Sequence, residues 1–183
     1  QNPLYKFWHD PAHGTIPIAT ALSPTLQELN SPLLDWYYSK MTTNDELMCG
    51  PTGVQYIFVQ YYNRELFPAW CDLTRLWCHD AGFHTVRIWM ARYGGARYIT
   101  YMKKCGFDAV LGDTEDLRPD FYPEIVTLGA KDKEDLFKQM IAIKPNPQQP
   151  KFFNFTPIVG GFYQGDHGYS AIKQDIERVE AAY

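Results

Sequence analysis

Apolar residues along the 183-residue chain alternate between short continuous runs and longer segments with helical spacing. Short apolar runs bounded by glycine or proline are typical of buried strands, and five are predicted, at residues 46–49, 84–90, 107–111, 124–128 and 151–159. Segments with apolar residues at helical spacing predict helices at residues 32–40, 70–81, 96–104, 132–143 and 169–182. The first 30 residues are rich in Pro, His and Gly, and we expect them to be irregular.

The segment that follows the first predicted strand is harder to assign. A helix is expected to begin near Gly53 and to run through VQYIFVQYYNREL, although this stretch is also rich in β-prone residues. The Phe67-Pro68 pair is expected to end that helix, because proline removes a backbone donor. Gly82 and Gly106 are expected to close the helices that follow.

Strands that alternate with helices of about ten residues are typical of βαβ units. The predicted fold class is therefore α/β, with a mostly parallel sheet and alternating helices, either open or part of a (β/α) barrel. A chain of 183 residues can form one core, so residues 1–183 are expected to be a single α/β domain. The pattern ends on a helix where a βα unit would next supply a strand, which is what a fragment of a longer chain would show.

Charge and hydropathy exclude two classes of partner. The chain has 17 basic and 21 acidic side chains and a formal net charge of −4, whereas a nucleic-acid groove needs clustered Lys and Arg. No apolar run approaches the roughly 18 residues that a membrane span requires. We therefore expect neither a nucleic-acid partner nor a membrane span.

Polar side chains gather in the loops that are expected to follow the strands, at residues 50–55, 91–95, 112–116 and 160–168. In parallel α/β folds, ligands bind where such loops converge. These loops contain Arg92, Tyr93, Asp113, Glu115, Asp116, Gln164, Asp166 and His167. Two carboxylates roughly 5–9 Å apart can cleave a glycosidic bond, so Asp113, Glu115 and Asp166 are candidate catalytic acids and bases. The alternative is that polar loops hold acids because they meet water.

His167 follows Asp166 in a glycine-bounded loop and could act as a base or helper, or the pair could cap the next helix. Other clusters are weaker candidates. His9 and His13 are four residues apart, but Pro11 argues against the helix that would make them metal ligands. The turn from Gly50 to Gly53 could hold an anion, but it lacks the GK[ST] of a P-loop.

The four cysteines form no CxxC pair, so they are expected to be mostly free, buried thiols. Cys49 stands at a strand end, but nothing in the sequence supports it as a nucleophile. We predict no metal and no cofactor.

One stretch of the chain resembles a known family. The matching residues, in order, are Ser23-Pro24, Leu26, Leu29, Pro32, Tyr37-Tyr38, Thr43-Asn44-Asp45, Gly50-Pro51, Gly53 and Tyr56. They resemble the C-terminal domain of the GxGYxYP putative glycoside hydrolase family. The motif is degenerate here, because Gln55, Phe58 and Val59 replace its second Gly, its second Tyr and its Pro. The family also carries an acidic DGDN segment upstream, which nothing before Leu4 supplies. We therefore expect the chain either to be a piece of a longer protein or to lack that part of the site.

The resemblance implies a carbohydrate-active protein, a glycoside hydrolase that is secreted or extracellular. It implies that carboxylates on the strand-exit loops hydrolyse the bond and that the substrate contacts Asp45, Tyr56, Trp89, Arg92, Tyr93 and Gln164. The 13 Tyr, 11 Phe and 5 Trp residues suit a cleft for sugar rings, or a Tyr-rich core. The changed motif favours an alternative, a glycan-binding protein without catalysis. A structural or assembly protein that forms oligomers is a third possibility.

Overall fold

The computed structural model describes residues 7–88, 95–112, 125–128, 133–144, 146, 148, 152–155 and 169–182. Four parallel strands form one sheet in the order β1 (Ile18–Leu22), β2 (Asp45–Cys49), β3 (Thr85–Ile88) and β4 (Ala109–Gly112). A second parallel pair consists of β5 (Ile125–Leu128) and β6 (Phe152–Phe155). The helices are α2 (Leu26–Leu29), α3 (Ser31–Lys40), the short 3-10 helix η1 (Val59–Tyr61), α4 (Phe67–Ala81), α5 (Gly95–Lys104), α6 (Lys133–Ala142) and α7 (Tyr169–Glu180).

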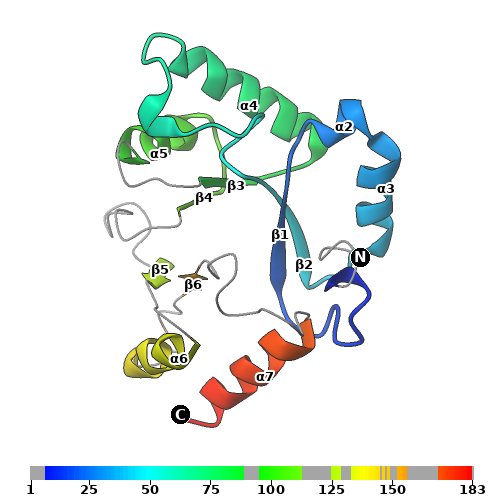
Figure 1. The fold of residues 1–183 in the computed structure, drawn as a ribbon, viewed down its shortest axis with the longest axis vertical. Coiled ribbons are helices and arrows are strands. Elements are labelled where there is room, and N and C mark those ends of the chain that lie inside the picture. The colour runs from blue at the N-terminus through cyan, green and yellow to red at the C-terminus, as the bar shows by residue number, and fades with distance from the viewer. Residues whose placement is uncertain are drawn as a thin grey trace.

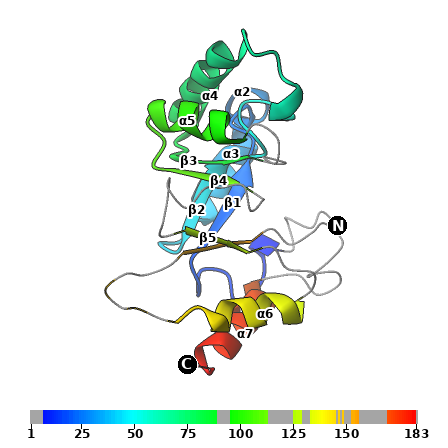
Figure 2. The same cartoon turned by 90° about the vertical axis from the view of Figure 1, so that its left-hand side faces the viewer.

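The α/β class and the parallel sheet with alternating helices are confirmed. The helices lie around the strands, from α3 through α4 and α5 to α6 and α7 (Figure 1). The β5–β6 pair forms a sheet of its own, and in the perpendicular view β5 lies between the four-stranded sheet and helices α6 and α7 (Figure 2). Within the described part of the chain no hydrogen-bonded ladder joins β4 to β5, so closure into a barrel stays a prediction.

Three expectations about the first 70 residues were wrong. Residues 18–22 are not irregular but form β1, which pairs along its whole length with β2, from Ile18 opposite Asp45 to Leu22 opposite Cys49. The helix expected from Gly53 does not form, and this segment holds only η1. Pro68 does not end a helix but lies in the first turn of α4, where its missing N–H costs nothing.

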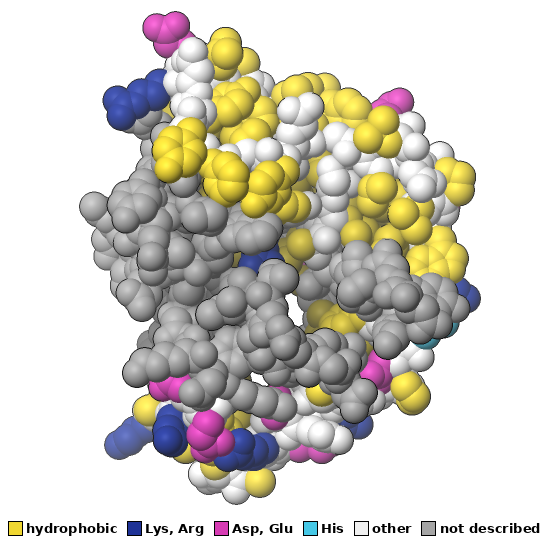
Figure 3. Space-filling model, in the orientation of Figure 1, with side chains coloured by type: hydrophobic (Ala, Val, Ile, Leu, Met, Phe, Trp, Pro, Cys, Tyr) yellow, Lys and Arg dark blue, Asp and Glu magenta, His cyan; other side chains and the backbone are white. Residues whose placement is uncertain are grey.

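The largest core lies between the four-stranded sheet and helices α3, α4 and α5. Its fully buried side chains include Cys49, Val86, Ile88, Tyr98 and Met102. Hydrophobic side chains gather over the part of the surface formed by α2 to α5, whereas charged side chains cluster near α6 and α7 (Figure 3). None of the described helices combines the length and the apolar character needed to cross a membrane.

Candidate functional site

The carboxyl ends of the four strands of the main sheet lie along one edge because all four are parallel. The last residues of β1 to β4 are Leu22, Cys49, Ile88 and Gly112. In parallel α/β sheets, ligands bind outside this edge. We call this edge of the sheet the carboxyl edge, and the loops that leave it form the candidate site.

Most residues predicted for the site belong to loops outside the described part of the chain. They are Trp89, Arg92, Tyr93, Asp113, Glu115, Gln164, Asp166 and His167. Chain connectivity places Trp89 directly after β3 and Asp113 directly after β4. The roles of these eight residues stay predictions.

The loop after β2 is the longest described loop at the carboxyl edge, and hydrogen bonds fix it to both neighbouring strands. The Gly50 N–H donates to the Leu22 carbonyl at 2.9 Å, and the Thr52 N–H donates to the Arg87 carbonyl at 2.7 Å. The buried Tyr98 hydroxyl of α5 donates to the Thr52 carbonyl. The loop is therefore fixed before it reaches Tyr56.

Gly53 allows this loop to pass directly against α4. Its φ is +133°, and a Cβ there would lie 2.6 Å from two ring atoms of Trp70 and 2.8 Å from Thr74 Oγ1. The next N–H, of Val54, donates to Thr74 Oγ1 at 3.2 Å. No helix begins at Gly53, so the turn lacks the helix dipole of an anion site. The N–H groups of Gly50, Thr52 and Val54 already donate within the protein.

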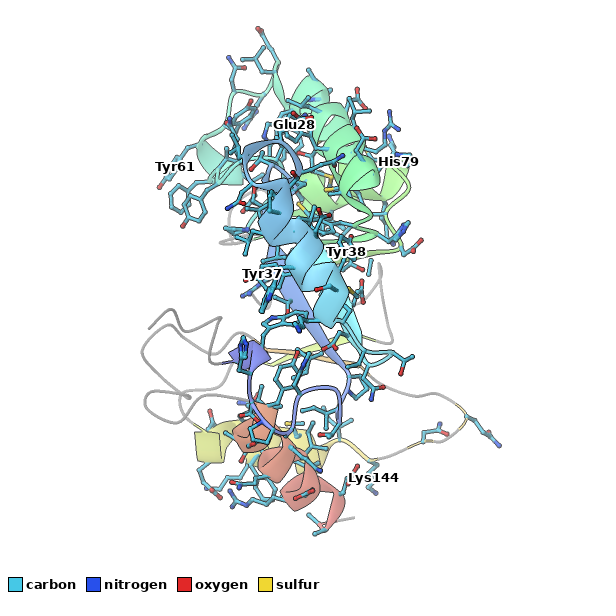
Figure 4. The ribbon with its side chains drawn as sticks, turned by 90° about the vertical axis from the view of Figure 1, so that its right-hand side faces the viewer. Glu28, Tyr37, Tyr38, Tyr61, His79 and Lys144 are labelled. Carbon is cyan, nitrogen blue, oxygen red and sulfur yellow. The ribbon has the colours of Figure 1, made fainter. Side chains whose placement is uncertain are left out.

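Three aromatic side chains lie next to one another near the end of this loop, and we call Tyr56, Phe58 and Tyr61 the aromatic ridge. The Phe58 ring lies 5.3 Å from the Tyr56 ring and 6.4 Å from the Tyr61 ring, edge-on in both cases. Tyr56 is 50% exposed and Tyr61 is 83% exposed. Tyr61 projects away from the body of the molecule (Figure 4). The ridge therefore presents ring surface to solvent.

The ridge rests on a buried aromatic base. Val59, the first residue of η1, is 9% exposed, and the neighbouring Tyr62 turns inward, with its ring 5.7 Å from Trp70. Trp70 in turn packs 5.5 Å from Tyr98 of α5, which holds the Thr52 carbonyl. One connected set of rings thus supports both the turn and the ridge.

Sequence reasoning selected Tyr56 but missed Phe58 and Tyr61, because it treated the segment as helical. The signal that could have found them is the Gly-Pro-Thr-Gly turn followed by an aromatic run with no charged residue before Arg64. An amphipathic surface helix would carry charged or polar residues on its outer face.

Asp45 lies at the opposite, amino edge of the sheet, because it is the first residue of β2. Its side chain is 1% exposed. The carboxylate accepts from the Thr42 N–H at 2.8 Å, the Thr42 hydroxyl at 2.7 Å and the Tyr169 hydroxyl at 2.8 Å, and His13 Nε2 lies 3.0 Å away. We propose that Asp45 ties β2 to α7 rather than contacting a substrate.

Burial alone would raise the Asp45 pKa, but the hydrogen bonds from Thr42 and Tyr169 outweigh it and hold that pKa below its usual value. The same carboxylate helps to raise the pKa of the Tyr169 phenol, after burial as the main cause. The pair is therefore a phenol that donates to a carboxylate, which is a stabilising arrangement at neutral pH.

Asp10 makes a second connection from the N-terminal segment to α7. Its Oδ1 accepts from the Ala12 N–H at 2.8 Å and from the Ser170 N–H at 3.2 Å and hydroxyl at 2.5 Å. The Phe7 ring lies 4.4 Å from the Tyr169 ring. These contacts join residues about 160 positions apart in the sequence.

The two histidines considered as metal ligands have different partners. His13 lies against Asp45, whereas the His9 ring stacks on Trp36 at 5.7 Å. Within the described ranges no group of three His, Cys, Asp or Glu side chains is placed to hold a metal ion.

The cysteines are free thiols, as expected, and three of the four are buried. The Cys49 thiol shares a hydrogen bond with Cys78, and that contact together with burial raises its pKa well above the usual value. Burial raises the pKa of Cys71 to about 12. Such thiols remain protonated at neutral pH and are poor nucleophiles.

The fold and the site together define an α/β protein with an aromatic surface on the loop that leaves the carboxyl edge of its parallel sheet. The chain belongs to the GxGYxYP putative glycoside hydrolase family, because residues 1–176 match the model of that family's C-terminal domain. The resemblance carried by the motif residues is therefore confirmed, and it extends over nearly the whole chain.

A solved structure has a similar fold. It is described as a putative hydrolase from Bacteroides thetaiotaomicron, and it matches with a TM-score of 0.70 and 17% sequence identity over 95% of this chain. The match covers 37% of that protein, so this chain spans little more than a third of its length. At this identity the likeness shows the fold alone. None of the curated proteins matches this chain in sequence.

Proposed function

We propose that this chain supplies the catalytic carboxylates of a glycoside hydrolase and cleaves glycosidic bonds at the carboxyl edge. The observation that carries the proposal is the parallel direction of β1 to β4 in a member of this family. That direction brings the starts of the aromatic loop after β2 and the acidic loop after β4 to one edge. Aromatic rings for sugar faces and carboxylates for proton transfer are the two components that this chemistry needs.

The proposed mechanism uses two carboxyl groups on opposite sides of the scissile bond. One protonates the leaving oxygen, and the other either activates water or attacks the anomeric carbon, depending on their separation. We assign these roles to two of Asp113, Glu115 and Asp166, with His167 positioning its neighbour. The side chains proposed to hold the sugar are Tyr56, Trp89, Arg92, Tyr93 and Gln164.

The test is to separate turnover from binding in single variants. Asp113→Asn, Glu115→Gln and Asp166→Asn remove a proton-transfer group with little change in size, so two of them should lower turnover by roughly 10²- to 10⁴-fold while glycan affinity is kept. Asp80→Asn is the matched control, because Asp80 is an exposed carboxylate on α4. Full turnover in all three variants would contradict the proposal.

The second candidate is a glycan-binding protein that does not cleave its ligand. It is favoured by the changes at Gln55, Phe58 and Val59 within the family motif, together with the exposure of Tyr61. This function predicts glycan binding without products, and Asp166→Asn would then change affinity only by the loss of a hydrogen bond.

A further inference from the structure

The aromatic ridge has no role in the chemistry of bond cleavage, yet two of its rings are exposed to solvent to an unusual degree. Tyr61 is the most exposed of the large hydrophobic side chains in the described part of the chain, at 83%, and Tyr56 is 50% exposed. Other tyrosines of the same loop and of α5 are used internally, such as Tyr62 on Trp70 and Tyr98 on the Thr52 carbonyl. The outward rings are therefore a distinct feature of the loop.

The ridge is held in place rather than free to collapse. Phe58 is half-buried and touches both exposed rings edge-on. The Tyr61 N–H donates to the Phe58 carbonyl at 3.0 Å, which closes η1. η1 in turn contacts α5. A preorganised aromatic surface loses little conformational entropy when it binds a ligand.

The chemistry of the ridge fits a neutral sugar chain. Tyrosine combines an apolar ring face with a hydroxyl at the rim, which matches a pyranose with C–H groups on its face and hydroxyls around it. Arg64 and Glu65, which follow the ridge and are exposed, carry opposite charges. Such a surface has no single-sign field for an anionic polymer.

The aliphatic side chains exposed nearby have a different character. Leu66, Leu73 and Leu76 are about half exposed at the start and on the outer face of α4. They carry no hydroxyls and do not extend the row of edge-on rings. The ridge is therefore a surface distinct from these leucines.

We propose that Tyr56, Phe58 and Tyr61 bind successive pyranose units of a neutral polysaccharide, so that the substrate is an extended glycan rather than a single terminal sugar. The role of the ridge in cleavage rests on the proposed function, whereas its binding of polysaccharide does not. Two exposed rings at the end of a loop that leaves the carboxyl edge would bind the sugars that flank the scissile bond and would not contact the bond itself.

The experiment measures binding and cleavage separately with the full purified protein. Binding is followed by native electrophoresis in gels that contain soluble β-glucan, xylan or galactomannan, and cleavage by product analysis on polysaccharides and on short aryl glycosides. The variants are Tyr56→Ala, Tyr61→Ala and the double variant. Tyr61→Phe keeps the ring, and Leu29→Ala removes an aliphatic side chain that is 80% exposed on α2.

The expected result is retardation of the wild-type protein by at least one polysaccharide. Each alanine variant should weaken that binding by roughly three- to tenfold, as expected for one aromatic contact. Tyr61→Phe should retain most of the affinity, and Leu29→Ala should bind like the wild type. Turnover on short aryl glycosides should be unchanged in Tyr61→Ala, Tyr61→Phe and Leu29→Ala.

Two results would overturn the proposal: no retardation by any of the polysaccharides, or retardation that survives in the double variant. The outcome is distinguishable from failure of the proposed function. Ridge-dependent binding without any product would support the ridge and contradict the hydrolase. Cleavage of polysaccharides that is insensitive to the double variant would support the hydrolase and contradict the ridge.

Discussion

Gly53→Ala is the most informative single perturbation of the loop that carries the aromatic ridge. The backbone at Gly53 has a φ of +133°, which L-residues rarely adopt. A non-glycine residue in such a region costs about 1–3 kcal/mol. The added methyl would also lie 2.6 Å from two ring atoms of Trp70, which is itself buried. Overpacking of this kind costs about 1–3 kcal/mol.

The two effects together predict that Gly53→Ala lowers the free energy of unfolding by about 4 kcal/mol. For a chain of this length, each kcal/mol shifts the midpoint by about 2–4 °C, so Tm should fall by roughly 8–16 °C. Because Trp70 also supports Tyr62 beneath the ridge, polysaccharide binding should weaken even at temperatures where the variant is folded.

Gly106→Ala is the matched control for this experiment. Gly106 also has a positive φ, of +84°, but nothing lies within 4 Å of the added Cβ. The free energy of unfolding of Gly106→Ala should fall only by the cost of a left-handed conformation, about 1–2 kcal/mol. Its glycan binding should be unchanged. Both variants can be measured by thermal and urea unfolding. Equal destabilisation of the two would refute the close contact between the loop and Trp70.

Three further predictions concern the rest of the described structure. The native pKa of Asp45 is lowered, so its contribution to stability is present above the unfolded pKa and is lost as pH falls below about 4. In urea titrations at several pH values, the free energy of unfolding of Asp45→Asn should therefore fall less steeply with acid than that of the wild type. An equally steep fall in the variant would contradict this. Tyr98→Phe leaves the Thr52 carbonyl without its donor and should cost about 1–3 kcal/mol, whereas a neutral effect by urea unfolding would exclude that bond. Among the thiols, half-buried Cys105 should react first with a disulfide reagent at pH 8, and Cys71, with a pKa raised to about 12, should react only on unfolding; mass spectrometry that finds Cys71 labelled first would contradict the burial.

The elements that the sequence predicted well are those with a local cause. The strand at β2, the α4 helix with its Gly82 end and the alternation through β3, α5 and β4 each have their own apolar pattern. The strand β1 was missed because residues 18–22 have no strong strand pattern of their own. They become a strand through pairing with β2, which a reading of local sequence does not include.

The segment after Gly53 was wrong for a related reason. Its apolar residues satisfy a helical or a strand period equally, and contacts from distant residues decide between them. The Thr52 N–H and the Val54 N–H are taken by the Arg87 carbonyl and by Thr74, which lie more than 15 residues away. For the site, the direction of the strands was predictable and located the carboxyl edge. The amino-edge position of Asp45 was also predictable, because Asp45 directly precedes the strand predicted at residues 46–49. The family resemblance, and not the strand pattern, selected Asp45 as a substrate contact.

The central claim is that the carboxyl edge hydrolyses glycosidic bonds, and product analysis in ¹⁸O-labelled water tests it most directly. Hydrolysis adds the water oxygen to the anomeric carbon of each new reducing end, whereas the other new end keeps the glycosidic oxygen. Incubation with a panel of polysaccharides should therefore release oligosaccharides that carry one ¹⁸O label at each newly formed reducing end, in amounts proportional to protein. Among the candidate acids, two of Asp113→Asn, Glu115→Gln and Asp166→Asn should abolish the labelled products, and Asp80→Asn should not. Unlabelled products, labelled products that persist in every variant, or no products from any polysaccharide would contradict the account.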